Sequence, residues 1–207
     1  PKPSSAASDV YKRQALRLSF LLDQVGIFGR TIEDMGLISK IIISKDSKDT
    51  STKIYPTENM ESSVLQDHPF DPKFVFVQTP KWKNLDSGSK KAFDQLRKKL
   101  EKNVVDFQDP SSFEKIFDYQ QIIMETDMAH NLSYFYEAHK NKIGKKLREA
   151  IERGQSYKSK DYAEAVDNIE TLYENMSELF HHFHAIITPA TTGEAPKGLA
   201  QTGSCLL

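Results

Sequence analysis

Two short apolar runs, each leading into a Thr-Pro step, constrain most strongly what this 207-residue chain can fold into. Residues 74–77 (Phe-Val-Phe-Val) lead to Thr79-Pro80, and residues 185–187 (Ala-Ile-Ile) lead to Thr188-Pro189. Short runs of β-branched and aromatic residues without charge are typical of strands buried on both faces of a parallel sheet. Proline cannot donate to a β-ladder, so each strand is predicted to end at its Thr-Pro step.

The segment after the first run predicts how that strand joins the sheet. A helix is expected with Ser89 as its N-cap and with Phe93, Leu96 and Leu100 on its apolar stripe. A third extended run follows at residues 104–107. Strand, helix and strand of these lengths form a βαβ unit, which crosses right-handed into a parallel sheet. The sequence therefore predicts an α/β fold.

A parallel sheet would place the two Thr-Pro steps together. Carboxyl ends of parallel strands share one edge, where loops build ligand sites, so Thr79 and Thr188 are expected at the same rim. Trp82 and the loop at residues 198–203 follow these steps directly. Trp82 has two open interpretations, which are a cap on the edge of the core and a contact to substrate.

Further helices are expected from apolar periodicity and capping residues. One begins at Thr31, a long one at Ser111 with Glu114 completing a capping box, and another at Ser159; a helix ending near Gly154 lies between the last two. Apolar stripes continue to Phe135 and Phe183. Residues 44–72 are polar and are interpreted as a surface excursion.

Composition excludes several classes of protein. The net charge of −1 gives no positive surplus for binding nucleic acid, and the single cysteine, Cys205, excludes a disulfide framework. No apolar run approaches the roughly 20 residues that span a bilayer. We therefore expect a cytoplasmic protein with no nucleic-acid or membrane partner.

The chain lacks the common site motifs. It contains no glycine-rich phosphate loop, no Gly-x-Ser-x-Gly elbow and no paired helical histidines. His181, His182 and His184 cluster near a helix end, but no cysteine or separated ligand pair at metal spacing accompanies them. We expect no metal site and no cofactor, and interpret these histidines as interacting with the helix dipole.

The first 14 residues have no apolar period and no capping residues. Residues 5–14 resemble translated sequencing adapter, and Cys205-Leu206-Leu207 has a similar character. The predicted organisation is thus a non-native or disordered tail at residues 1–14 and a partial domain at residues 15–207.

Several ordered blocks resemble the amidase-signature family of hydrolases. The late block reads Ile186-Ile187-Thr188-Pro189-Ala190-Thr191-Thr192-Gly193-Glu194-Ala195-Pro196, then Gly198-Leu199 and Thr202-Gly203. Earlier blocks are Leu22-Asp23-Gln24-Val25-Gly26, Phe28-Gly29-Arg30, Thr79-Pro80-Lys81-Trp82 and Ile151-Glu152-Arg153-Gly154. Asp127 stands where the family usually has Glu. The resemblance implies the C-terminal half of an amidase-signature α/β/α layered fold, a mixed sheet with long covering helices.

The resemblance implies amide hydrolysis by a Ser-Ser-Lys triad. One serine attacks the carbonyl, a second relays the proton, and the lysine is the ultimate base. In the family these residues lie upstream of Leu22, so no catalytic residue is expected here and the chain alone is expected to be inactive. The expected partner is a small-molecule amide, and the expected substrate-binding residues are Thr79, Trp82, Thr188, Thr202 and Gly203. With no arginine in either rim loop, an uncharged amide fits better than a carboxylate.

Two other functions remain open from the sequence. The first is a helix-rich interaction module without catalysis, whose stripes bind a partner protein. The second is the A-type subunit of a tRNA-dependent amidotransferase, which has a related fold. The Thr-Pro-x-Trp and Gly-Glu-Ala-Pro blocks favour a free-standing amidase.

Overall fold

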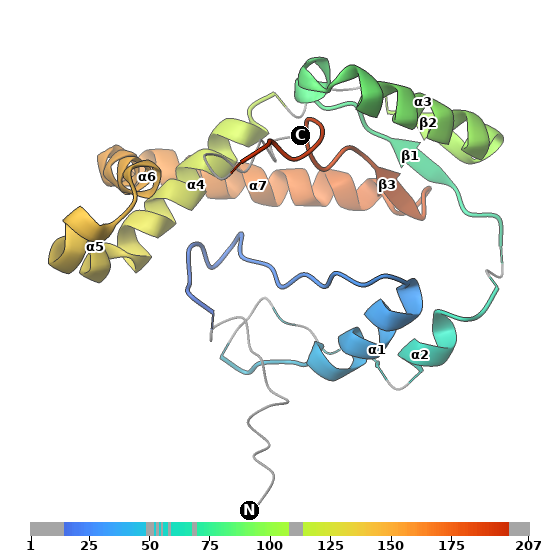
Figure 1. The fold of residues 1–207 in the computed structure, drawn as a ribbon, viewed down its shortest axis with the longest axis horizontal. Coiled ribbons are helices and arrows are strands. Elements are labelled where there is room, and N and C mark those ends of the chain that lie inside the picture. Colours follow the sequence, from blue (N-terminus) through green and yellow to red (C-terminus); the bar gives the residue numbers. More distant parts are fainter. Residues whose placement is uncertain are drawn as a thin grey trace, which may run out of the picture. The chain divides into compact units, whose positions relative to one another are not determined.

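The computed structural model describes residues 15–48, 52, 54, 56–57, 59–67, 70–107 and 114–198. Two compact units divide the chain, one within residues 1–67 and 124–157 and the other within residues 68–123 and 158–207. The elements in Figure 1 are α1 (Ile32–Ile42), α2 (Met60–Ser63), β1 (Phe74–Phe76), η3 (Pro80–Asn84), α3 (Ser87–Leu100), η4 (Glu101–Asn103), β2 (Val104–Asp106), α4 (Ile116–Asn131), α5 (Ser133–His139), η6 (Lys140–Lys142), α6 (Lys145–Ser156), α7 (Ser159–Leu179) and β3 (Ala185–Ile187). Among the helices of the described ranges, none is long and apolar enough to cross a membrane.

The second unit is built on a three-stranded parallel sheet in the order β2-β1-β3. Phe76 pairs with Asp106 on one side and with Ile187 on the other, so the three strands end at one edge. The ladder extends beyond the strands, because the Val77 N–H donates to the Ile187 carbonyl at 3.0 Å. The predicted strands and their parallel pairing are confirmed. All described strands are parallel, so the antiparallel part of the expected mixed sheet is not among the described residues.

Burial on both faces, which the sequence predicts for the strands, holds only for the central one. Val75 and Phe76 of β1 are 1% and 0% exposed. In contrast, β3 is only partly buried and Val105 of β2 is 53% exposed. The prediction is wrong for β2 and β3 because they lie at the two edges of the described sheet, where each pairs with β1 alone among the described strands.

Helix α3 covers the face of the sheet that carries Phe76. The Phe76 ring packs against Phe93 of α3, with ring centroids 5.8 Å apart. The predicted N-cap of this helix, Ser89, is wrong: Asp86 is the cap, and its carboxylate accepts hydrogen bonds from the N–H and the hydroxyl of Ser89, both at 2.8 Å. Both residue types cap helices well, and the extended backbone of Asp86 decides between them.

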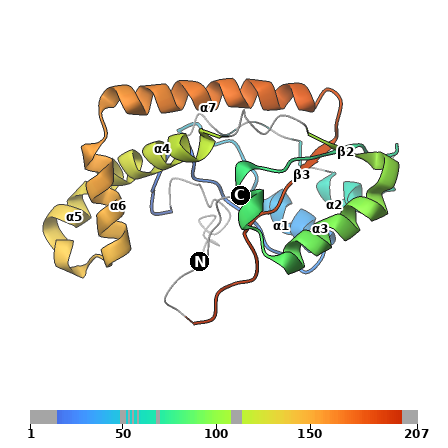
Figure 2. The ribbon, with the colours of Figure 1, turned by 90° about the horizontal axis from the view of Figure 1, so that it is seen from above.

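Helix α7 covers the opposite face. Alternate residues of a strand point to opposite faces, so Val75 and Val77 face away from α3. Packed against these two valines are Leu172, Met176 and Leu179 of α7, with Ile116, Phe107, Phe183 and Ile186. Figure 2 shows α7 and α3 on opposite sides of the strands. The predicted α/β/α layering is therefore confirmed.

The boundaries predicted for α7 need two corrections. Its N-cap is Lys158 rather than Ser159, and the Asp161 carboxylate accepts the Lys158 N–H at 3.1 Å. The helix ends at Leu179, and residues 180–182 form a turn, although the apolar period continues to Phe183.

In the first unit, α1 begins at the predicted residue. The Thr31 hydroxyl accepts the Asp34 N–H at 3.2 Å, and the buried Gly36 packs against Val64 beside α2. The stretch predicted to be a surface excursion contains α2 and a buried carboxylate, Asp46, which is 5% exposed. It is more structured than its polarity indicated because Asp46 accepts the Lys48 N–H and closes a turn.

The long helix predicted from Ser111 to Phe135 is divided in the structure. Ser111 lies outside the described residues, Glu114 lies in a turn, and α4 begins at Ile116. The helix breaks at Leu132, whose backbone (φ −101°, ψ 7°) leaves helical geometry, and α5 then carries Phe135, which is 46% exposed. The prediction that Phe135 is a core residue is wrong, because the bend turns its part of the stripe to solvent.

A buried carboxylate joins α4 to α6 in the same unit. Glu125, 6% exposed, accepts two hydrogen bonds from Arg153 Nε at 3.1 Å and one from Nη2 at 2.6 Å, and Tyr157 donates to it at 3.1 Å. These bonds raise the pKa of the Arg153 guanidinium. Beside them, the Gly154 backbone lies so close to the Glu125 carbonyl that an added Cβ would overlap it. The block at residues 151–154 thus serves helix packing.

Asp127, which departs from the family pattern, also has a structural role. It accepts a 2.5 Å hydrogen bond from the hydroxyl of Ser19, which is completely buried. Four residues later on α4, Asn131 donates to the Leu18 carbonyl at 3.1 Å. The segment that begins at residue 15 is therefore held on α4 by side chains of both residues.

Candidate functional site

The carboxyl edge of the sheet brings the two Thr-Pro steps together. Thr188 directly follows β3, and Thr79 lies three residues after the end of β1, the strand next to it. The sheet order is β2-β1-β3, so the chain passes from β1 to β2 on one side and then crosses to β3 on the other side of β1. A strand order of this kind creates a switch point between β1 and β3, where open α/β sheets bind ligands.

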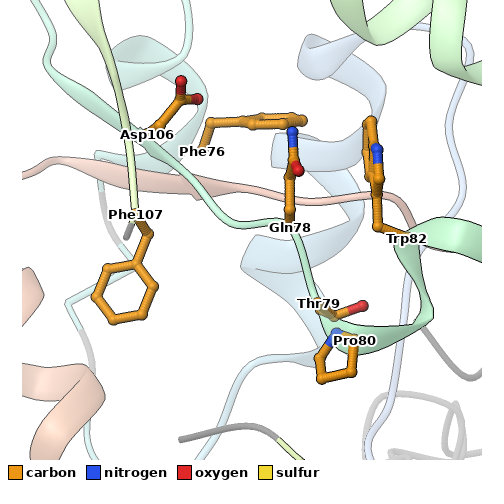
Figure 3. A pocket seen from close by; sticks show the side chains of 7 residues that line it. All are labelled: Phe76, Gln78, Thr79, Pro80, Trp82, Asp106 and Phe107. Carbon is orange, nitrogen blue, oxygen red and sulfur yellow. The ribbon is translucent and has the colours of Figure 1, made fainter. Parts of the chain in front are cut away.

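Next to this switch point, a pocket of about 430 Å³ lies over the ends of β1 and β2. Its walls are Phe76, Gln78, Thr79, Trp82, Asp106 and Phe107, with Pro80 between Thr79 and Trp82. In the view of Figure 3, Asp106 and Phe107 lie on one side, Trp82 and Pro80 on the other, and the Gln78 amide between them. The volume lies within the range of small-molecule sites, roughly 300–1,000 Å³.

Two of the five predicted binding residues, Thr79 and Trp82, line this pocket. Thr188 is exposed on the neighbouring loop and is not among the lining residues. Thr202 and Gly203 lie outside the described residues. A substrate-binding role for these five residues stays a prediction.

Sequence reasoning missed Gln78, Asp106 and Phe107. The apolar pattern predicts one strand over residues 104–107, but β2 ends at Asp106, and pairing with Phe76 places that residue at the sheet edge. An acidic residue at the end of an apolar run was the signal that could have revealed it.

Trp82 is held by the aromatic core beneath it. Its ring meets Phe76 edge-on at 5.4 Å and Phe93 at 5.9 Å, and its backbone N–H donates to the Thr79 carbonyl at 2.9 Å in η3. Pro80 favours this turn because its fixed φ suits the first helical position. The ring therefore caps the edge of the core and at the same time forms a wall of the pocket.

The carboxylate in the pocket is charge-paired. Asp106 forms an ion pair with Arg97 of α3, and the Arg97 guanidinium lies over the Phe76 ring at 5.1 Å. Because the guanidinium balances the carboxylate, the remaining polar lining consists of the neutral Gln78 amide and Thr79 hydroxyl. The arrangement suits binding of an uncharged polar ligand.

The family of the chain follows from comparison with known proteins. A family model described as Amidase matches residues 2–204. The chain belongs to the amidase family. Its expected α/β/α fold agrees with this membership.

Three solved structures share the fold of this amidase-family chain. A "crystal structure of amidase" is 19% identical over 69% of the chain and 34% of that structure, with a TM-score of 0.55. An inhibitor-bound complex linked to the origins of an s-triazine catabolic enzyme is 16% identical over 80% and 36%, with a TM-score of 0.68. A 6-aminohexanoate cyclic dimer hydrolase is 13% identical over 87% and 40%, with a TM-score of 0.62. At these identities the likeness concerns the fold alone.

A closer match in sequence covers a short stretch. The A-type subunit of the glutamyl-tRNA(Gln) amidotransferase from Sulfurihydrogenibium sp. (strain YO3AOP1) is 44% identical over 46 residues, which are 22% of this chain and 10% of that protein. The amidase-family chain thus spans well under half the length of these three structures and of this subunit.

The amidase block after β3 is fixed to the start of α3. The Asp86 N–H donates to the Thr192 carbonyl at 2.9 Å, and a Cβ added to Gly193 would overlap the Asp86 carboxylate. The Thr191 hydroxyl donates to the Gly193 carbonyl at 2.7 Å, and Gly198 has φ +91°, which favours glycine. The glycines of this block therefore serve close packing and a left-handed backbone.

Two of the histidines near β3 contact neighbouring side chains and backbone. His184 Nδ1 accepts the Lys73 N–H at 2.9 Å, and its ring stacks on Phe70 at 4.5 Å. His181 lies 3.9 Å from Glu178 in the turn after α7. Within the described ranges no group of three His, Cys, Asp or Glu residues could hold a metal ion.

Proposed function

We propose that this chain forms the C-terminal, substrate-binding part of an amidase that hydrolyses a carboxamide C–N bond. The observation that carries the proposal is the shared edge at which Thr79 and Thr188 follow adjacent parallel strands, next to the pocket with Trp82. The serines and lysine of the Ser-Ser-Lys mechanism would come from a segment upstream of Leu22.

In the proposed reaction, the attacking serine adds to the amide carbonyl and backbone N–H groups hold the oxyanion. The second serine relays the proton to the leaving nitrogen, so that ammonia or an amine departs and an acyl-enzyme remains. Water then attacks this ester, releasing the carboxylic acid and restoring the serine. The present chain would contribute positioning: Thr79 and Gln78 offer hydrogen bonds, and the Trp82 ring excludes water.

The small share of the related structures that this chain covers supports an enzyme longer than the present chain. The chain spans only 34–40% of the three amidase-fold structures. Large apolar side chains of α1 are exposed, including Ile32 at 61%, Leu37 at 50% and Ile41 at 59%. Exposed apolar surface of this kind is typical of a face that a further part of a domain covers.

The 44% identical stretch favours a second candidate, the A-type subunit of a tRNA-dependent amidotransferase. That subunit would share the amide chemistry but work with partner subunits. The Thr79-Pro80-Lys81-Trp82 block supports the free-standing enzyme instead. Amide hydrolysis by the complete protein without partner subunits would decide for the amidase. A cytoplasmic location stays a prediction.

The direct experiment compares two purified proteins. One is the present chain and the other is its extension by the upstream coding sequence. We expect ammonia release from simple carboxamides by the extended protein and none by the present chain, relative to heat-killed controls. Release by the present chain, or none by the extended protein over a broad amide panel, would overturn the proposal.

A further inference from the structure

We infer that copies of this chain associate with one another through opposite charges, with the outer face of α3 in one copy lying against the outer face of α7 in the next. This inference goes beyond the proposed function and does not depend on amide hydrolysis. Three observations carry it, namely the charges of the two faces, the repulsion within α7 and the equal spacing of the charges on both helices.

The outer face of α3, which points away from the sheet, is basic. Residues 87–102 contain six basic and two acidic residues. Lys91, Lys98 and Lys99 are exposed, and none of the three forms an ion pair with another described residue. The acidic side chain of Asp94 lies 4.0 Å from Arg97 and is paired with it. This face therefore presents positive charge that the described part of the chain does not balance.

The outer face of α7 is acidic. The helix contains six acidic residues and one basic residue, Lys160. Leu172, Met176 and Leu179 pack on the sheet, so the polar side of the helix points away from it. Exposed carboxylates on this helix are Glu164, Asp167, Glu170, Glu174 and Glu178. The two helices thus present charges of opposite sign on the two sides of one sheet.

The carboxylates of α7 repel one another within a single molecule. Glu170, Glu174 and Glu178 follow each other at intervals of four residues, and like charges at this spacing destabilise a helix. Glu178 also lies in the last turn, which has no basic residue although the helix dipole favours cations there. His181 lies 3.9 Å from Glu178 in the following turn. A positive surface from outside the molecule would relieve the repulsion along the rest of this row.

The charges of the two faces also match in spacing. Lys91 and Lys98 are seven residues apart on α3, and Asp167 and Glu174 are seven residues apart on α7. Seven residues of an α-helix rise by about 10.5 Å, so two parallel helices can bring both pairs of opposite charges together. This match favours the α3 of a second copy as the partner of α7 over an isolated cation such as a metal ion.

The inferred contact joins two different surfaces of the chain. Because α3 and α7 lie on opposite faces of the sheet, each copy can present α3 to one neighbour and α7 to another (Figure 2). A heterologous contact of this kind continues into an open array of copies or closes into a ring. Exposed ion pairs contribute little each and are screened by salt, so the association should be weak and sensitive to ionic strength.

Sedimentation velocity of the full chain, in buffer with EDTA, tests the association. At about 10 mM salt and up to about 1 mM protein we expect concentration-dependent association that extends beyond dimers. At about 1 M salt the association constant should be lower by about tenfold or more, because the Debye length falls from about 30 Å to about 3 Å. No association at low salt, or association that high salt leaves unchanged, as apolar contacts would give, would overturn the inference.

Charge reversal tests whether the two faces meet. Lys91→Glu with Lys98→Glu, and separately Asp167→Lys with Glu174→Lys, should each weaken self-association by about tenfold or more. These positions are exposed, so circular dichroism should stay unchanged. A chain that carries all four substitutions keeps the wild-type net charge of −1 and again has faces of opposite sign, so it should regain self-association. A failure to regain it would refute the pairing of α3 with α7.

A matched control separates the position of the charges from the net charge. Lys142→Glu with Lys146→Glu changes the net charge by the same amount as the reversal on α3, at two exposed lysines outside both helices. This variant should retain self-association better than the α3 reversal does. An equal loss in both variants would show that net charge, and not the face of α3, governs the association.

Discussion

The backbone N–H of Asp86 donates a 2.9 Å hydrogen bond to the carbonyl of Thr192, which joins the loop after β3 to the start of α3. Asp86 is also the N-cap of α3, so one residue fixes both the helix and the loop. The two loops at the rim of the sheet are therefore coupled through α3.

Gly193→Ala should disturb this coupling. The new Cβ would overlap the Asp86 carboxylate, which must then move and lose its bonds to Ser89. We expect a lower free energy of unfolding, measured by urea denaturation. In an Asp86→Ala background the same change should cost less, because the obstructing carboxylate is gone. Equal losses in both backgrounds would show that the contact is unimportant.

The free energy of unfolding should depend on pH in the acid range because Asp86 caps α3 with an ionised carboxylate. Hydrogen bonds from the Ser89 N–H, and then from its hydroxyl, hold the pKa of Asp86 below its usual value. Because the pKa of Asp86 is lower in the folded state than in the unfolded state, its ionised carboxylate stabilises the fold at pH values above the unfolded-state pKa, which is about 3.9. That contribution is lost as the pH falls through the folded-state pKa.

Asp86→Asn keeps a good cap without a titrating group. The stability of the wild type relative to this variant should therefore be constant near neutral pH and fall below about pH 4. The comparison isolates Asp86 from other carboxylates such as Glu152, whose pKa is also lowered, mainly by its hydrogen bond with Lys140. A difference that does not change with pH would contradict the assignment.

Gly154→Ala tests the contact between α4 and α6. Helix propensity alone favours Ala by about 1 kcal/mol, but the added Cβ would overlap the backbone carbonyl of Glu125, which cannot rotate away. We expect net destabilisation of roughly 1–3 kcal/mol, the usual cost of overpacking. Gly26→Ala is the control, since a Cβ added there meets no described atom within 4 Å beyond its chain neighbours, and should stay within about 0.5 kcal/mol. A neutral or stabilising Gly154→Ala would be inconsistent with this packing.

Glu125→Gln tests the buried charge on α4. The change weakens charge-assisted bonds from Arg153 and should lower the free energy of unfolding by roughly 1.5–3 kcal/mol, typical of hydrogen bonds to charged groups. Glu149→Gln makes the same substitution in an exposed pair with Lys145 at 3.8 Å, and should cost less than about 0.5 kcal/mol. Equal effects of both substitutions would argue against a special role for Glu125.

The sequence predicted features that depend on local pattern. The strands at Phe74 and Ala185 stood out because their short apolar runs end at Thr-Pro, and parallel pairing then brought Thr79 and Thr188 to one edge. The helical period identified α7, and the residue type of Thr31 identified the start of α1.

Features that depend on tertiary geometry were missed. Asp86 and Ser89 are both good caps, and backbone conformation distinguishes them. The apolar periodicity continues through Leu132, so it does not predict the break between α4 and α5. Asp106 entered the pocket through pairing with a strand some 30 residues away, a relationship that its neighbours in sequence do not encode.

The most direct test of the account is the effect of Trp82→Ala on the steady-state kinetics of the extended, active protein. Removing a wall of the proposed substrate pocket should raise KM by about tenfold or more while kcat changes little, because ground state and transition state lose the same contact. Trp82→Phe keeps a ring in the wall and should have a smaller effect on KM. A fall in kcat at constant KM, or a loss of stability with both constants unchanged, would contradict the assignment of this rim as the substrate-binding surface.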